Sequence, residues 1–513
     1  MKKFLSLCLT LLLTGVLPGT LQATTYANYN LQPAVERTAA QAFLFGKNNP
    51  RRQARANKKL AAQYRPVLFN RFMKYVAYNS QSSYTEEITP GQIETAKKLY
   101  QELSQLGLDV TLSEHYYIFV KVPSNLTREV PILGFSCHYD VTPDVTTDNV
   151  HPRIITNYSG DTIQVGTDPK GNPVVLDPNT VRDAYLKTRV GKKIVTSDGS
   201  TNLGADNRAG MSIVVTMLEA LAKNPSKPHG EIQVVIAPNE ETGGAADYIS
   251  EVPYRPDIAF DFDGNVDGEL MTENFYAMQI ICQVKGAEGH QSNADGTYIN
   301  HGLPQADFIH QLYYNPALLT EPFQNNSIVD PKNEYGRWLR LPTDSRGKQG
   351  YVDVFIKRKA NDITEVDFRL RSFNKTDLLQ IHQLIMDVAK QVEQQNIMID
   401  PMTDRIRKKL TITCPTNPSY TYDNIKDRVH PASLEVASAA FAAAGVKMRP
   451  TYERAGTTGS IFALKGVVGS YMLFTGQNNM HSYAEWLSEE DMYQAFLVGL
   501  NLIDQVAQLN TNK

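Results

Sequence analysis

Cysteine is scarce in this sequence, and neither sign of charge is in excess. The 513 residues include 4 cysteines, and 51 Lys and Arg stand against 54 Asp and Glu, for a formal net charge of -3. This balance implies no basic face for nucleic acid. Cys8 lies near the amino terminus, in a segment that we expect to be cleaved off. The three that remain, Cys137, Cys282 and Cys414, are an odd number at wide spacing. We therefore expect neither a disulfide framework nor a Cys-rich zinc site.

The apolar stretch near the amino terminus is too short for a comfortable membrane span. It runs from Phe4 to Val16, follows Lys2-Lys3, and is followed by Leu21-Gln22-Ala23. A positive start, a short apolar stretch and a small residue at a cleavage point are typical of a signal peptide. We therefore expect export, to a periplasm or out of the cell, with no membrane span after cleavage. The length of the stretch disfavours the alternative, an uncleaved anchor.

The rest of the chain is long and of ordinary composition. Hydrophobic residues at 42% and charged residues at 20% describe a soluble globular protein, and 513 residues are too many for one ordinary core. Short apolar strands alternate with helices as far as Ala277, which predicts an α/β fold with a mixed, mostly parallel sheet flanked by helices. From there to Cys414 the predicted order is βαββαβ, which indicates an inserted α+β module.

Side chains that can bind metal follow the predicted strands, or begin a helix, at one edge of this sheet. His138 and Asp140 leave the buried strand Pro131–Ser136 together, and Glu241 follows the β-branched strand Ile232–Ala237. The carboxyl edge of such a sheet is where ligands bind. Two imidazoles and three carboxylates suit zinc or a similar divalent ion. The five candidate metal ligands are His138, Asp206, Glu241, Asp263 and His481.

Five protein ligands exceed what one catalytic zinc ion normally takes, because three ligands and a water are usual. Two ions that share one bridging carboxylate would use all five. Such ions, roughly 3.5–4 Å apart, can hold a hydroxide and polarise a carbonyl. Glu240 adjoins Glu241, so one carboxylate can bind metal while the other takes a proton from the water. Asp140 is well placed to fix the tautomer of His138.

Each candidate also has an ordinary structural explanation. His138 could be a hydrogen-bonded histidine at a strand end, and Asp206 a helix N-cap. Glu240 and Glu241 could form a solvated turn, and Asp263 with the following glycine could be a turn signal. His481 in a polar loop is unremarkable by itself. Because all five ligands fall at the ends of elements in one sheet, we favour the metal site over separate coincidences.

Several segments resemble the dizinc exopeptidases, the family that includes peptidase T, carboxypeptidase G and the aminoacylases. The resemblance is greatest to the peptidase T type, a tripeptide aminopeptidase, and covers residues 69–508. The motif segments are His138-Tyr-Asp140, Gly204-Ala-Asp206, Glu240-Glu241, Asp263-Gly264 and His481-Ser-Tyr-Ala-Glu485. The segments that resemble peptidase T beyond these motifs are Asn149–Ile154, Thr196–Asp206 and Gly268–Phe275.

The resemblance assigns the metal ligands to two ions. It implies two Zn2+ ions, for which Co2+ or Mn2+ could substitute. His138 and Asp263 would hold one ion, and Glu241 and His481 the other. Asp206 would bridge them.

The resemblance also implies catalytic and substrate-binding residues. Glu240 would be the general base and would then protonate the leaving amine. Asp140 would orient a metal-binding histidine. His290 would help to hold the oxyanion and the substrate, and Arg454 would bind the substrate. The alternatives are a hairpin surface residue for His290 and a structural salt bridge for Arg454.

Three residues depart from the pattern of this family. Asn207 stands where a second Asp is usual, Gln291 replaces a Pro, and Thr458 replaces an Asp. None of the three is a predicted metal ligand, so hydrolysis is still expected. Two of them lie in segments expected to face the substrate, which weakens the case for a strict tripeptide preference.

The implied activity is that of a zinc-dependent exopeptidase. We expect an aminopeptidase that releases the N-terminal residue of tripeptides or other short peptides by attack of a hydroxide held by two zinc ions. A dipeptidase, carboxypeptidase or N-acyl amino acid amidohydrolase is the alternative, and a non-catalytic peptide-binding protein is a more distant one. The sequence leaves open whether the chain forms a homodimer.

The implied domains follow from the same resemblance. An amphipathic helix over residues 70–80 would open the catalytic domain. The expected segments are a signal peptide over 1–23, a surface extension without assigned chemistry over 24–66, a catalytic domain over 67–274 and 419–513, and an inserted lid domain over 275–418.

Overall fold

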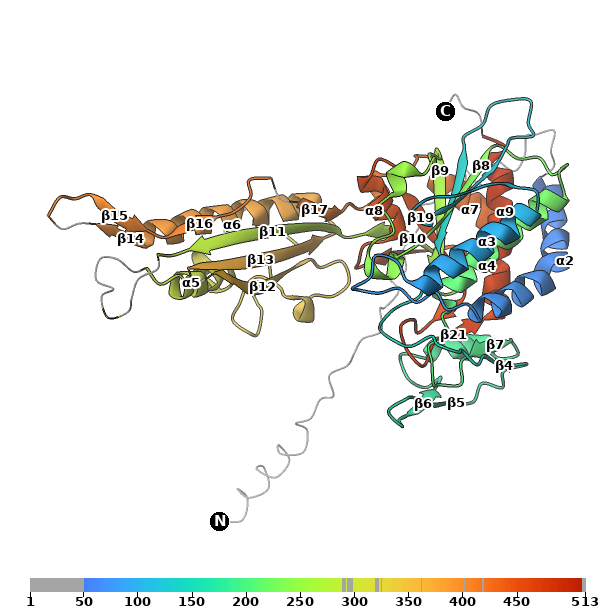
Figure 1. Ribbon diagram of the computed structural model, residues 1–513, viewed down its shortest axis with the longest axis horizontal. Coiled ribbons are helices and arrows are strands. Elements are labelled where there is room, and N and C mark those ends of the chain that lie inside the picture. The colour runs from blue at the N-terminus through green and yellow to red at the C-terminus, as the bar shows by residue number, and fades with distance from the viewer. Residues whose placement is uncertain are drawn as a thin grey trace, which may run out of the picture.

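The computed structural model describes residues 50–287, 292, 299–318, 323, 325–360, 362–399, 402–417 and 419–509. The expected signal peptide over residues 1–23 lies outside this part of the chain. Among the described residues, no helix combines the length and the apolar character that a bilayer crossing needs. Figure 1 shows a broad body built around a large sheet, with an elongated arm projecting from it.

A mixed sheet of eight strands forms the centre of the broad body. In sheet order the strands are β1 (Asp109–Leu112), β2 (Ile118–Val122), β8 (Ile232–Ala237), β3 (Leu133–His138), β9 (Ile258–Gly264), β19 (Ser470–Phe474), β10 (Glu269–Asn274) and β18 (Arg449–Glu453). Parallel pairs join β3 to β8 and β9, β9 to β19, and β10 to β18. The other neighbours are antiparallel. The expected α/β fold with a mixed sheet is thereby confirmed.

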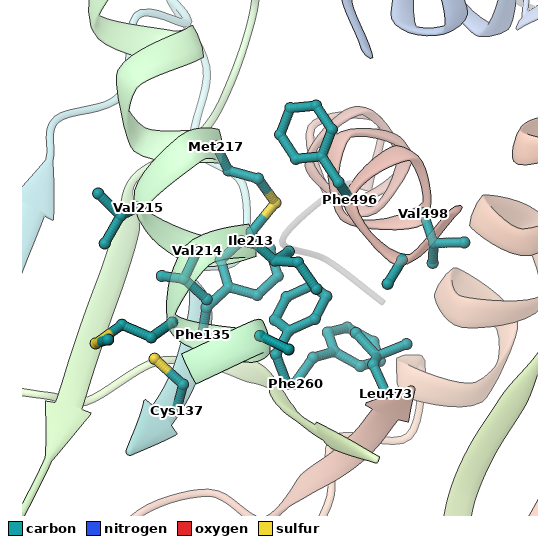
Figure 2. Close-up of a cluster of buried hydrophobic side chains, with 14 of the residues drawn as sticks. Phe135, Cys137, Ile213, Val214, Val215, Met217, Phe260, Leu473, Phe496 and Val498 are labelled. Carbon is teal, nitrogen blue, oxygen red and sulfur yellow. The ribbon is translucent and has the colours of Figure 1, made fainter. Parts of the chain in front are cut away.

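Helices cover both faces of the sheet, which is why β3 and β8 are buried along their whole length. On one face, Phe135 and Phe260 pack with Phe496 of a helical layer (Figure 2). On the other face, Val235 belongs to a cluster with Phe462. The first layer consists of α2 (Pro50–Val76), α3 (Pro90–Gln105), α4 (Ala205–Lys223), α7 (Ser433–Ala444) and α9 (Glu489–Val506), and the second contains α8 (Thr458–Leu464).

Helix α2 corrects the expected boundary between a surface extension and the catalytic domain. The extension was expected to end at residue 66, before a helix over residues 70–80, but one helix runs from Pro50 to Val76. Tyr64 lies in the main core, and Asn57 donates a hydrogen bond to Asn501 Oδ1 at 3.0 Å. The segment looks polar in sequence because some of its buried side chains are polar and find their partners inside the protein. Residues 24–49 lie outside the described chain.

A smaller sheet lies beside the central one. Its strands, in order, are β20 (Gln477–Asn478), β21 (Trp486–Ser488), β7 (Ile194–Thr196) and β4 (Arg153–Ile155), and β5 (Ile163–Thr167) pairs nearby with β6 (Pro173–Leu176). Trp486 is buried in the core of this region. Because β21 pairs with β7, the loop between β20 and β21 is brought next to the start of α4. Residues far apart in sequence thus meet at one edge of the central sheet.

The arm is an α+β domain inserted between β10 and β18 (Figure 1). Its elements are β11 (Tyr276–Lys285), α5 (Gly302–Tyr314), β12 (Tyr351–Ala360), β13 (Ile363–Ser372), α6 (Lys375–Gln395), β14 (Ile397–Ile399), β15 (Ile406–Lys409), β16 (Thr411–Thr413) and β17 (Ser419–Tyr422). Apart from the β14–β15 hairpin, the elements through β16 follow the expected βαββαβ order. The sheet order is β12-β13-β11-β16, and β17 also pairs with β11, so this domain extends to Tyr422, beyond the expected end at residue 418. The rings of Phe308 and Phe368, 5.5 Å apart, lie in a core of the domain's own.

A disulfide bond joins Cys282 to Cys414. The expectation that the cysteines would form no disulfide framework is therefore wrong for this pair. The two are 132 residues apart in sequence. The chain runs out through the whole inserted domain and returns in β16, which pairs with β11 so that Gln283 faces Thr413. The spacing of the cysteines in the sequence could not show that Cys282 and Cys414 are neighbours in the fold. Cys137 is a free, buried thiol.

Candidate metal centre and active site

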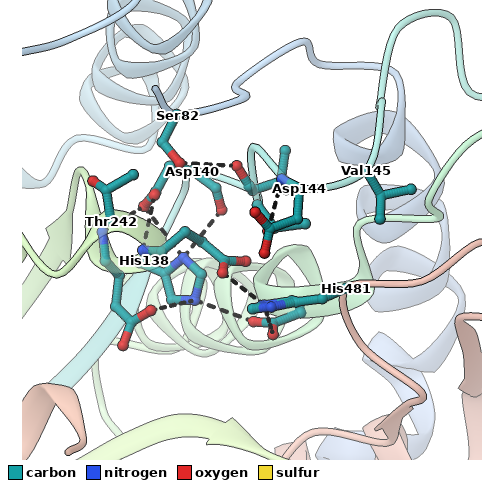
Figure 3. A network of polar contacts seen from close by, with 12 residues as sticks. Ser82, His138, Asp140, Asp144, Val145, Thr242 and His481 are labelled. Atoms are coloured by element: carbon teal, nitrogen blue, oxygen red, sulfur yellow. Dashed lines mark hydrogen bonds and ion pairs between the residues drawn. The ribbon is translucent and has the colours of Figure 1, made fainter. Parts of the chain in front are cut away.

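Five parts of the chain meet at the carboxyl edge of the central sheet (Figure 3). β3 ends at His138, β8 leads into a short 3-10 helix at Glu240–Thr242, and Asp263 lies near the end of β9. These ends are adjacent because β3 lies between β8 and β9. Asp206 comes from the first turn of α4, and His481 from the loop after β20. The structure therefore brings all five predicted metal ligands together.

The two oxygens of one carboxylate face two different imidazoles. Asp206 Oδ1 lies 3.2 Å from His138 Nε2, and Asp206 Oδ2 lies 3.4 Å from His481 Nε2. His138 Nε2 also lies 3.6 Å from Asp263 Oδ1, and His481 Nε2 lies 2.6 Å from Glu241 Oε2. Asp206 is thus at the centre, with one imidazole and one further carboxylate on each side.

The side chains of this cluster fit divalent cations. His138, Glu240 and Asp263 offer ligand atoms within 4.8 Å of one another, and so do His138, Asp206 and Glu241. Among the described residues, none gives a hydrogen bond to the buried Glu241 Oε1. A buried carboxylate oxygen without a partner is costly, and a cation would satisfy it. Imidazole nitrogens and carboxylate oxygens are the donors that zinc and similar ions take.

The pKa values in the cluster are shifted because several carboxylates lie close to two imidazoles. Burial would raise the pKa of Asp206, but hydrogen bonds from His138 and His481 lower it overall. Hydrogen bonds to Asp206 and Glu241 raise the pKa of His481 to about 11. Burial raises the pKa of Glu241 to about 8 and also raises that of Glu240. Without a cation, protons therefore supply the positive charge that this site needs.

Asp140 connects two of the strand ends. His138 Nδ1 lies 3.0 Å from the backbone oxygen of Asp140 and 3.3 Å from its Oδ1, which favours a proton on Nδ1 and leaves Nε2 for a cation. The Asp140 carboxylate also accepts hydrogen bonds from the backbone N–H groups of Glu240, at 3.0 Å, and Glu241, at 3.2 Å. The first contact is the one expected from the sequence. The second was missed, because it depends on the pairing of β3 with β8.

Glu485 belongs to the site, although its sequence pattern predicted no role for it. It is fully buried, and its carboxylate accepts hydrogen bonds from the backbone N–H groups of Gly204, at 2.5 Å, and Asp206, at 3.0 Å. Burial raises the pKa of Glu485 to about 8. The available signal was its place four residues after His481, in a motif that otherwise supplies a metal ligand.

The three departures from the family pattern lie in different surroundings. Asn207 is buried, donates to the backbone oxygen of Phe262 at 2.7 Å and accepts from the N–H of Gly210 at 3.0 Å, so it ties α4 to β9. Thr458 donates a hydrogen bond from Oγ1 to Glu240 Oε1 at 3.3 Å. Gln291 and the predicted oxyanion residue His290 lie outside the described residues.

Arg454 contacts the inserted domain. Its guanidinium donates to the backbone oxygen of Gly347 at 2.7 Å and to Ser345 Oγ at 2.6 Å, and it lies 5.1 Å from the ring centre of Phe275. Among the described residues, the hydrogen-bond partners of the guanidinium are neutral oxygens and not the carboxylate of a salt bridge. Its predicted role in substrate binding stays a prediction.

Paired imidazoles and carboxylates around a divalent-cation site, with a further carboxylate beside them, define a metal-dependent hydrolase. The model of peptidase family M20/M25/M40 matches residues 204–505. Peptidase T of Halothermothrix orenii is 32% identical to this chain, over 85% of it and 98% of the relative. Peptidase T of Vibrio cholerae serotype O1 is 31% identical, over 86% and 98%. The chain belongs to the M20/M25/M40 peptidase family, as its motifs predicted, and is a metal-dependent exopeptidase.

Solved structures share the fold at low sequence identity. The aminopeptidase PepT of Bacillus cereus aligns with a TM-score of 0.59 and 16% identity, over 86% of this chain and 99% of its own. A tripeptidase of Staphylococcus aureus gives 0.56 and 19%, over 87% and 99%. A dinuclear metal-binding M20 peptidase of Bacillus subtilis gives 0.51 and 12%, over 86% and 99%. At these identities the likeness shows the fold alone.

Proposed function

We propose that this protein is an exported aminopeptidase that uses two zinc ions to release the N-terminal residue of tripeptides and other short peptides. The observation that carries the proposal is that Asp206 presents one oxygen to His138 and the other to His481, at 3.2 and 3.4 Å. A two-ion site with a bridging carboxylate requires this arrangement. The aminopeptidase activity and the short substrate are supported by relatives named peptidase T and by structures titled aminopeptidase PepT and tripeptidase.

The ligands divide between two ions in this proposal. His138 and Asp263 would hold one ion, Glu241 and His481 the other, and Asp206 both. When bound, such cations supply Lewis acidity, because they polarise a carbonyl and lower the pKa of water.

Glu240 is the proton carrier in this proposal. Its Oε2 lies 3.9 Å from His138 Nε2, so the carboxylate borders the cluster of the five assigned ligands. It takes a proton from the attacking water and delivers it to the leaving amine. Asp140 holds the backbone of Glu240 and the ring of His138 in one arrangement.

Peptides with blocked ends test the proposed activity. The zinc-loaded protein is incubated with Ala-Ala-Ala, its N-acetylated form and its C-amidated form, and the released amino acids are quantified. We expect cleavage of the free and C-amidated peptides and none of the N-acetylated one. Cleavage that survives N-acetylation but not C-amidation would overturn the aminopeptidase proposal. Glu240→Gln serves as the control: it should keep its metal and lose turnover by roughly 10²–10⁴-fold.

The number and identity of the ions are tested by reconstitution. The protein is stripped with a chelator and reloaded with Zn2+, Co2+ or Mn2+ in separate titrations, with metal content and turnover measured together. We expect two equivalents per chain at full activity, with zinc the ion bound by the protein as isolated. Full activity at one equivalent would contradict the two-ion site.

Export is supported by two features of the chain. Residues 2–23 have the layout of a signal peptide, and Cys282 and Cys414 form a disulfide bond, which persists mainly in oxidising compartments. The test is to express the whole sequence in a bacterium with two membranes, to fractionate the cells and to sequence the amino terminus. We expect a chain that begins at residue 24 in the periplasm or the medium. A full-length chain in the cytoplasm would contradict export.

A further inference from the structure

Glu240 is held by two groups from distant parts of the chain. Its backbone N–H donates to Asp140 Oδ1 at 3.0 Å, which fixes the position of the Glu240 backbone. Its side chain is held separately, because Oε1 accepts a hydrogen bond from Thr458 Oγ1 at 3.3 Å. The other oxygen, Oε2, is the one that lies 3.9 Å from His138 Nε2. The two carboxylate oxygens therefore have different surroundings, one occupied by a hydroxyl and one facing the metal ligands.

The Thr458 hydroxyl is itself firmly placed. Thr458 is 2% exposed and is the first residue of α8. The preceding Thr457 caps this helix: its Oγ1 accepts from the N–H of Ser460 at 3.2 Å, and its own N–H donates to Ser460 Oγ at 2.9 Å. On the other side, Gly459 lies against β19, where an added Cβ would come within 2.3 Å of Ser470 Oγ. The helix start cannot shift without disturbing the central sheet.

No second donor duplicates this contact among the described residues. Thr458 is the one side chain there whose hydrogen bond reaches the Glu240 carboxylate. The last torsion of a glutamate is broad, so the plane of an unrestrained carboxylate samples many orientations. Proton transfer requires the accepting oxygen at about 2.6–3.2 Å from the water oxygen. One hydrogen bond to Oε1 restricts the rotation and leaves Oε2 directed at the reacting atoms.

We propose that Thr458 is a positioning residue for the general base: its hydroxyl holds Glu240 Oε1 so that Oε2 receives the proton of the attacking water. The proposal rests on the proposed function, in which Glu240 acts as the base. It makes a specific claim about the hydroxyl group, as opposed to the shape or burial of the side chain. Removal of the hydroxyl should slow turnover and leave metal and substrate binding intact.

The test compares Thr458→Val, which is isosteric and lacks the hydroxyl, with Thr458→Ser, which keeps it. Thr95→Val is the matched control, because Thr95 is also a buried threonine but lies in α3. For each protein we would measure zinc content, the Kd of a tripeptide analogue with a reduced scissile bond, and kcat and KM for Ala-Ala-Ala. Thr458→Val should lose kcat by roughly tenfold to a hundredfold, with KM, analogue affinity and zinc content within twofold of the wild type. Thr458→Ser and Thr95→Val should stay within about threefold of the wild type in kcat.

Two results would overturn the proposal. The first is a zinc-loaded Thr458→Val protein with wild-type kcat. The second is an equal loss of kcat in Thr458→Ser, which would show that shape matters and the hydroxyl does not. If Thr458→Val melts several degrees lower than the wild type, Thr458→Ala replaces it with the same criteria. Failure of the proposed function is distinct, because the wild type itself would then cleave none of the peptides or would still cleave the N-acetylated one.

Discussion

The carboxylate of Glu485 accepts a hydrogen bond from the backbone N–H of Asp206, at 3.0 Å. One buried acid therefore holds the peptide group of the residue that faces both imidazoles of the metal cluster. The same carboxylate accepts a hydrogen bond from the N–H of Gly204, so the turn that begins α4 is anchored at two points. Metal sites depend on such supporting groups, because they fix the orientation of the ligands.

Replacement of Glu485 should weaken both the fold and metal binding. Glu485→Ala leaves two buried N–H groups without an acceptor, and each costs about 1–3 kcal/mol. We expect a lower Tm of the metal-free protein and a zinc affinity reduced by roughly 10–100-fold. Glu485→Gln is the control, since its amide oxygen can still accept one of the two hydrogen bonds. Its Tm and zinc affinity should lie between those of the wild type and those of Glu485→Ala. Calorimetry and zinc titration check this. A Glu485→Ala protein with unchanged Tm and affinity would contradict it.

Metal loading should release protons and should strengthen as pH rises. Hydrogen bonds to Asp206 and Glu241 raise the pKa of His481 to about 11, and burial raises that of Glu241 to about 8. At pH 7 the His481–Glu241 pair therefore holds at least one proton in the metal-free protein, whereas a cation binds neutral imidazole and ionised carboxylate. We expect a net proton release and an affinity that increases between pH 6 and pH 8. Titration calorimetry in buffers of different ionisation enthalpy measures the release, and His481→Ala should reduce it. Metal uptake without proton release would contradict these pKa values.

The disulfide between Cys282 and Cys414 should stabilise the inserted domain. It closes a loop over 132 residues, for which chain entropy predicts about 4–5 kcal/mol, and typical measured values are about 2–4 kcal/mol. The double variant Cys282→Ser/Cys414→Ser should unfold at lower urea, and reductant should lower the midpoint of the wild type and leave that of the variant unchanged. Cys137→Ala, which removes a buried free thiol, should stay sensitive to reductant. A wild type indifferent to reductant would refute the prediction.

The metal ligands could be predicted because each follows a local pattern. His138 and Asp263 end buried strands, and Asp206 begins an apolar helix, so the sequence placed them at one edge of the sheet. Which oxygen faces which ring depends on tertiary contacts, as the split of Asp206 between two imidazoles shows. The periodic spacing of hydrophobic residues predicts helices and strands, but it does not predict which carboxylate oxygen faces which imidazole.

The missed features all depend on partners that are distant in sequence. Glu485 reaches α4 only because β21 pairs with β7. Cys282 meets Cys414 only after the chain has passed through the whole inserted domain. Asn57 lies in a helix whose polar sequence suggests exposure. It is buried because it meets its polar partner Asn501, which lies in α9. In each case a polar or small side chain is buried by pairing, and burial of that kind leaves no apolar signal.

Arg454 links the catalytic domain to the inserted domain, and its replacement should loosen that link. Its guanidinium donates to Gly347 and Ser345, so Arg454→Met removes these bonds, and the ion pair of Lys348 with Glu273, at 2.6 Å, is left to hold the loop at residues 345–349. We expect amide hydrogen exchange in that loop to become roughly tenfold faster, with β3 and β8 unchanged, because charged hydrogen bonds of this kind contribute about 1.5–3 kcal/mol. Ser345→Ala is the matched variant, since it loosens the loop and keeps the arginine.

The pair of variants also separates an anchoring role from the substrate-binding role predicted for Arg454. If the arginine binds peptide, Arg454→Met should raise the KM for Ala-Ala-Ala about tenfold, since a charged contact is lost. Ser345→Ala should then leave KM within about twofold of the wild type, because the guanidinium of Arg454 is still present to bind the substrate. Equal increases of KM in both variants would mean that the loop contact governs binding and that Arg454 acts through the inserted domain. An unchanged exchange rate in Arg454→Met would show instead that other contacts hold the loop.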